Sequence, residues 1–68
     1  MKEYSNSEIA ALIDDHIHSE RDRLIMHLRL IDGWTYEKIA AHRDIDMSVK
    51  QISRIISICC ARIEKHMQ

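Results

Sequence analysis

Cationic and hydrogen-bonding side chains recur at helical spacing between residues 48 and 57. They are Ser48, Lys50, Gln51, Arg54 and Ser57. At 100° per residue, Lys50, Arg54 and Ser57 share one face of a helix, and Gln51 lies on its flank. Arg and Lys side chains suit the acceptors of guanine in the major groove, and Gln suits adenine. These residue types at this spacing predict base contacts in duplex DNA.

A long helix at about 48–66 must position these side chains. Ser48 and Gln51 have the spacing of a capping box, in which each side chain bonds to the backbone of the other. An apolar stripe follows on the face opposite Lys50 and Arg54, and it is expected to be buried. Its members are Ile52, Ile55, Ile56, Cys59, Ile63 and Met67.

A short helix at about 35–43 precedes the long one and is expected to anchor it. Thr35 is a suitable N-cap, and Ile39 and Ala40 are predicted to face inward. Residues 44–47 form the corner between the two helices. A short helix, a corner and a longer helix with polar residues outside are typical of a helix-turn-helix. Three further side chains on or near the short helix are predicted to contact phosphates, namely Tyr36, Lys38 and Arg43.

Two more helices are expected before this pair, at about 6–17 and 20–31. Ser5 with Glu8 predicts the first start, and Ser19 followed by Asp22 predicts the second. Asp32-Gly33 predicts the second stop, since glycine tolerates the left-handed conformation that ends helices. The sequence contains no proline and one glycine. We therefore expect an all-α fold, a small four-helix domain over residues 1–68 that contains a helix-turn-helix.

Composition and charge narrow the function further. The net charge is −1, but residues 1–20 are predominantly acidic and residues 49–68 predominantly basic, which places positive charge on the last helix. The chain has no apolar run of transmembrane length and no visible signal peptide, so a cytoplasmic protein is expected. Cys59 and Cys60 are adjacent and unsuited to bonding each other, which indicates reduced thiols. No nucleophile, phosphate-loop or metal-ligand motif occurs, so we expect neither an enzyme, nor a cofactor, nor a metal site.

Residues 19–40 resemble region 4 of bacterial sigma factors. The resemblance is carried by the Glu- and Arg-rich run at 20–23, the apolar helix that follows, Asp32-Gly33, and the segment Thr-Tyr-Glu-Lys-Ile-Ala at 35–40. It extends over about residues 19–64. It implies a four-helix module that binds the promoter −35 element and contacts RNA polymerase. Small regulators from phages and mobile elements of Gram-positive bacteria are similar to an isolated module of this kind. Asp44 stands where the family usually has glycine, and aspartate tolerates positive φ comparatively well.

The leading hypothesis is therefore a sequence-specific DNA-binding transcriptional regulator whose last helix enters the major groove. Apolar side chains outside the main stripes also predict a homodimer; the candidate contacts are Met26, Leu30 and Ile58. The alternative is a protein-interaction module on the same scaffold, with RNA polymerase or a host defence protein as partner. The near-neutral charge and the corner acids Asp44 and Asp46 favour that alternative.

Overall fold

A computed structural model describes residues 3–67 of the chain, so residues 1, 2 and 68 of the expected domain lie outside the described part. Within it the chain forms four α-helices and no strand, which confirms the predicted all-helical class. The helices are α1 (Asn6–His16), α2 (Glu20–Leu30), α3 (Tyr36–Ala40) and α4 (Val49–Glu64).

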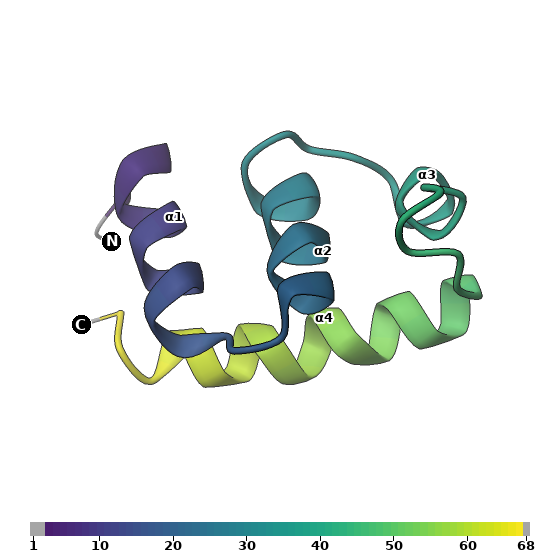
Figure 1. Ribbon diagram of the computed structural model, residues 1–68. Coiled ribbons are helices and arrows are strands. Elements are labelled where there is room, and N and C mark those ends of the chain that lie inside the picture. Colours follow the sequence, from purple (N-terminus) through teal and green to yellow (C-terminus); the bar gives the residue numbers. More distant parts are fainter. Residues whose placement is uncertain (1–2, 68) are drawn as a thin grey trace.

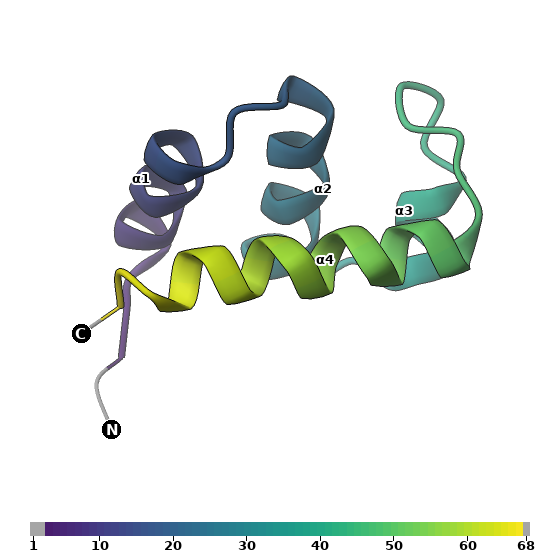
Figure 2. The ribbon, with the colours of Figure 1, turned by 90° about the horizontal axis from the view of Figure 1, so that it is seen from below.

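The last helix, α4, runs along one side of the other three helices and contacts each of them (Figure 1). α1 and α2 run antiparallel, side by side, and α3 lies beyond α2 above the start of α4 (Figure 1). Seen from below, α4 crosses the whole molecule beneath them (Figure 2). It packs against each of the other helices. One long helix therefore holds the three shorter ones together and keeps its opposite side free.

A single apolar cluster fills the space between α4 and the three helices above it. Leu, Ile and Met side chains at helical spacing supply most of it, because burying apolar area is the main driving force for folding. Six side chains are almost completely enclosed: Ile13, Ile17, Ile25, Met26, Ile39 and Ile52. The fold also uses a ring contact at its edge, since His16 and His66 stack with centroids 3.6 Å apart. That stack joins the end of α1 to the turn after α4.

Each helix starts at the hydroxyl residue that the sequence predicts. Ser5, Ser19, Thr35 and Ser48 are the four N-caps, and each side chain accepts a bond from a backbone N–H three residues on. The helix ends differ more from expectation. α3 stops at Ala40 rather than near residue 43, and α4 stops at Glu64 rather than 66. At the end of α1, the Arg23 Nε donates to the Ile17 carbonyl oxygen at 2.6 Å, a cap that the sequence analysis missed.

Gly33 turns the chain back after α2, as predicted. Its φ is +73°, in the left-handed region that glycine enters without steric cost. The reversal lets the Trp34 N–H donate to the Leu28 carbonyl oxygen at 2.9 Å. The connection to α3 is thereby fixed to the last turns of α2.

We expect Gly33→Ala to destabilise the protein by about 1 kcal/mol, which is the cost of a side chain in the left-handed region. A Cβ at this position meets nothing within 4 Å, so the effect isolates backbone strain from packing. Urea denaturation of Gly33→Ala and Gly33→Asn measures it, because asparagine tolerates this conformation better than alanine. Equal unfolding free energies of the wild-type and Gly33→Ala proteins would contradict the left-handed backbone conformation of Gly33.

Two further properties concern the whole described part. Over residues 3–67 no helix has both the length and the apolar character needed to cross a bilayer. Both cysteines are unbonded, with Cys59 buried and Cys60 half-buried. Desolvation raises the pKa of each thiol, and nearby acidic groups add to the effect. The thiolate, which is the reactive form, is therefore suppressed at neutral pH.

Candidate nucleic-acid interface

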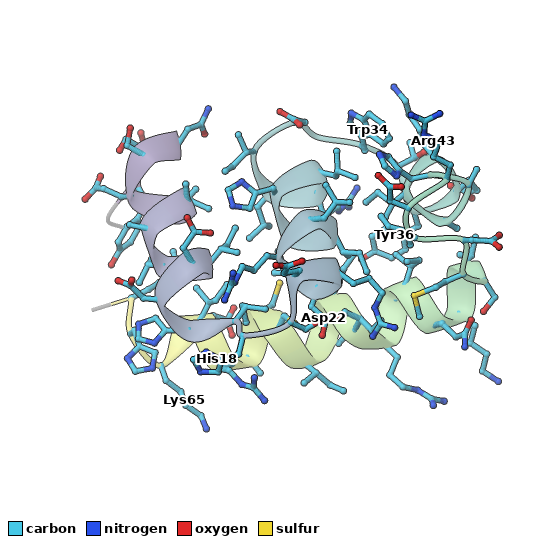
Figure 3. The ribbon with its side chains drawn as sticks, viewed as in Figure 1. His18, Asp22, Trp34, Tyr36, Arg43 and Lys65 are labelled. Carbon is cyan, nitrogen blue, oxygen red and sulfur yellow. The ribbon has the colours of Figure 1, made fainter. Side chains whose placement is uncertain are left out.

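The free side of α4 carries a row of exposed side chains that we call the outer face. Its members are Lys50, Arg54, Ser57, Ile58, Ala61 and Lys65. They lie opposite the buried stripe, and Figure 3 shows Lys65, the residue that follows α4, projecting on the side remote from the other helices. The row contains three cations and no acid. Its side chains are available to a partner as large as a nucleic-acid duplex.

Lys50 and Arg54 are the two cations on the first turns of this face. Both are exposed, and neither side chain forms a hydrogen bond or ion pair with any other residue in the range 3–67. A cation that is not already paired keeps its full capacity to donate to phosphates or guanine edges. The structure thus brings these two predicted residues together on one accessible surface, with Ser57 one turn beyond.

Ser48 and Gln51 are exposed as well, but both are engaged in the N-cap of α4. The Ser48 backbone N–H donates to Gln51 Oε1 at 3.0 Å, and the Gln51 N–H donates to Ser48 Oγ at 3.2 Å. The Ser48 hydroxyl also donates to Gln51 Oε1, at 3.1 Å. Bidentate recognition of adenine needs that oxygen as an acceptor together with the amide nitrogen. Gln51 therefore keeps only its Nε2 donors for a base while the cap is closed.

The buried stripe of α4 holds the outer face in place. Ile52, Ile56, Cys59 and Ile63 are buried as predicted, whereas Ile55 is half-buried. Across from them, Ile39 and Ala40 of α3 are buried too. Small Ala40 lets the two helices approach closely, because it has no side chain beyond Cβ. Lys50 and Arg54 therefore project from a helix whose position is fixed by packing.

The segment between α3 and α4 is a folded corner rather than a loose loop. The N–H groups of Ile45 and Asp46 both donate to the His42 carbonyl oxygen, and the Met47 N–H donates to the Ala40 carbonyl oxygen at 3.2 Å. Ile45 is 6% exposed and belongs to the core, a role that the sequence analysis did not assign. In the sequence, the one sign of this buried role is an apolar side chain placed between two aspartates, Asp44 and Asp46. The corner is therefore pinned by backbone bonds and by one buried side chain.

The residue of this corner at positive φ is Asp46, at +47°, and not Asp44. Asp44 instead lines a shallow polar hollow with Glu20, Arg21 and Leu24 at the start of α2. The Asp44 N–H donates to His42 Nδ1 at 3.1 Å. Asp44, the corner residue at which positive φ was expected, therefore has a negative φ. The residue that must adopt positive φ is Asp46, two residues before Ser48, the N-cap of α4.

The three residues predicted to contact phosphates have different surroundings and do not share one surface. Tyr36 is half-buried beneath the Arg29 guanidinium, whose carbon lies 4.6 Å from the ring centroid. Lys38 Nζ lies 4.2 Å from the ring centroid of Trp34. Arg43 is exposed, and Figure 3 shows it on the side of α3 remote from α4. Tyr36 therefore packs beneath Arg29, Lys38 is exposed but lies over Trp34, and Arg43 lies away from the outer face.

Arg29 holds this aromatic group together, and the sequence analysis missed it. Besides covering Tyr36, its Nη1 donates to the Trp34 carbonyl oxygen at 2.9 Å. Trp34 in turn lies beside His42, with ring centroids 5.9 Å apart. One guanidinium from α2 thus links the connecting segment to the first turn of α3. Its place in a run of alternating charged and apolar residues gave no sign of this role.

The three predicted dimer contacts do not form one surface. Met26 is completely buried in the core, so it cannot contact a second copy of this fold. Leu30 borders an apolar groove of about 240 Å³ between α1, α2 and the second half of α4. Ile58 lies on the outer face of α4. The prediction failed for Met26 because a helical spacing alone does not say which of two adjacent faces is covered.

No known protein family, curated protein sequence or solved structure matches this chain. Nor does the described part of the chain bring three or more His, Cys, Asp or Glu side chains into a group suited to a metal ion.

Proposed function

We propose that the protein is a sequence-specific DNA-binding transcriptional regulator in which α3 and α4 act as a helix-turn-helix. The observation that carries the proposal is the outer face of α4, where Lys50 and Arg54 are exposed and unpaired above a buried stripe. An α-helix fits the major groove, and cations on its first turns reach base edges and phosphates there. The resemblance of residues 19–64 to sigma region 4 supports the same use.

Within this proposal the side chains divide into two groups. Lys50, Arg54 and Ser57 contact bases, and Gln51 contributes its amide donors. Ser48 acts mainly through its cap, which fixes the start of α4. Tyr36 stabilises the position of α3 through its contact with Arg29. When DNA is present, the Lys38 ammonium group moves from the Trp34 ring to a phosphate. Such a shift costs little, because an exposed cation–π contact contributes about 0.5–1 kcal/mol.

Selection from a pool of random duplexes, followed by titration of the enriched sequence across salt concentrations, tests the proposal. Enrichment of one motif, with affinity that falls linearly with log salt, is the expected outcome. The absence of both would overturn it.

A protein-interaction module is the second candidate, and the apolar groove favours it. Ile9 and Leu12 of α1, Leu30 of α2 and Cys60 of α4 line this groove, which is open to solvent. Exposed apolar concavities are common at protein–protein contacts. In that case DNA binding would be absent or insensitive to salt. A purified partner such as RNA polymerase would instead bind with a defined stoichiometry, and Leu30→Asp would abolish the complex.

The acidic corner gives a prediction of its own. Asp46 precedes the N-cap region of α4 by two residues, so its charge lies close to the expected path of a phosphate. We expect Asp46→Asn to raise DNA affinity about two- to threefold at low salt, because a repulsive charge is removed and asparagine tolerates positive φ. Fluorescence anisotropy measures the change. Asp15→Asn, an exposed acid on α1, is the control with the same change in net charge. A similar gain in both variants would show that only net charge matters.

A further inference from the structure

One apolar side chain lies in the middle of the charged outer face. Ile58 is 55% exposed, against 40% for Val49 and 38% for Leu30, the other exposed large apolar residues of the described part. It follows Arg54 by one helical turn, so the two side chains are neighbours on the surface of α4. The DNA-binding role proposed for Lys50 and Arg54 does not account for an apolar group at this position.

A second copy of the chain is a poor occupant for this position. Two α4 helices that met antiparallel at Ile58 would place Arg54 of one copy opposite Arg62 of the other, because residues i−4 and i+4 then face each other. Parallel helices would place Arg54 opposite its own counterpart. Like charges in direct opposition are destabilising. The charge of this face instead complements a polyanion.

We propose that Ile58 contacts the methyl group of a thymine in the major groove and so selects a thymine within the bound sequence. This inference rests on the proposed DNA-binding function. The C5-methyl of thymine is the apolar group that base edges present in that groove, and apolar side chains are its usual partners. An exposed branched side chain with Arg54 one turn before it and Arg62 one turn after it matches such a target. The cations hold the duplex, and the apolar contact discriminates among base pairs.

The spacing of the face also predicts where this thymine lies. One helical turn advances about 5.4 Å along α4, while successive base pairs are separated by about 3.4 Å. Ile58 therefore faces a base pair one or two steps from the one that Arg54 contacts. Since Arg favours guanine, the selected motif should contain a guanine and, one or two base pairs away, a thymine on either strand.

The test replaces each thymine of the selected duplex, in turn, by deoxyuridine, which lacks only the methyl group. We expect one position at which wild-type affinity falls about fourfold, the equivalent of about 0.8 kcal/mol for one buried methyl group. The Ile58→Ala protein should bind the thymine duplex with a similar loss and should be insensitive to uracil at that position. Leu30→Ala, which truncates an exposed apolar side chain elsewhere, should retain the full sensitivity. Circular dichroism confirms that both variants keep their helices.

The possible outcomes separate the two proposals. Specific, salt-dependent binding with equal affinity for thymine and uracil at every position would overturn the role of Ile58 and leave the DNA-binding function intact. Sensitivity to uracil that persists unchanged in Ile58→Ala would assign the methyl contact to another residue and overturn it too. Absence of binding to any duplex would overturn both.

Discussion

Replacing Lys50 and Arg54 together by alanine is expected to weaken binding to the selected duplex by at least about 30-fold. An arginine and a lysine that contact bases each contribute about 1–3 kcal/mol, and the lower limit of about 2 kcal/mol for the pair corresponds to that loss. Both side chains are exposed and unpaired, so their removal leaves no buried group without a partner. The helix should therefore remain intact, since alanine is the best helix former. Anisotropy titrations at several salt concentrations measure the affinity and the salt slope.

The matched control is the double variant Arg62→Ala/Lys65→Ala. It removes the same charge from the other end of α4, where both side chains are exposed and neither forms an ion pair within residues 3–67. A uniform electrostatic attraction would make the two double variants equally weak, whereas specific contacts on the first turns make the first far weaker. Unchanged affinity in Lys50→Ala/Arg54→Ala would remove the outer face from the binding site.

The largest expected effect on stability comes from Ile52→Ala. Ile52 is completely buried, on the face of α4 that packs into the core. Truncating a buried isoleucine to alanine costs about 2–5 kcal/mol, through lost apolar burial and the cavity left behind. A 68-residue domain has a net stability of only about 3–10 kcal/mol at the usual value per residue. We therefore expect the variant to lose a large part of its unfolding free energy, which thermal and urea denaturation measure as lower transition midpoints.

Ile58→Ala serves as the control, since it makes the same chemical change on the same helix at an exposed position. Its unfolding free energy should stay within about 0.5 kcal/mol of the wild-type value, as is usual for surface positions. A loss of less than about 1 kcal/mol in Ile52→Ala would mean that the core tolerates the cavity. The assignment of Ile52 as the anchor of α4 would then be wrong.

The parts of the fold that follow from local sequence signals were predictable. Hydroxyl residues with a partner three positions later mark every helix start, because the N-cap bond forms within one turn. The buried stripe of α4 follows from helical periodicity alone. Gly33 was predictable too, since few other residues adopt its φ without strain.

The features that were missed depend on contacts between segments. Arg23 caps α1 and Arg29 joins α2 to the Trp34 carbonyl, yet in the sequence both look like ordinary surface charges. Ile45 lies between two aspartates, and only the closing of the corner brings it into the core. The exposure of Lys50 and Arg54 was inferred correctly from the helix alone. The capping bonds that occupy Gln51 Oε1 limit its availability in a way that residue type did not indicate.

The position of α4 beneath the other helices also bears on how the chain folds as it is synthesised. α1, α2 and α3 leave the ribosome first, but most of their buried side chains have no complete cover until α4 emerges. A nascent chain that ends before residue 49 would expose Ile13, Ile25 and Ile39 to solvent. Exposed apolar surface of this kind is what chaperones bind and what promotes aggregation. Folding is therefore expected to follow translation of α4. The helix that carries the outer face is then also the one whose synthesis allows the domain to become stable.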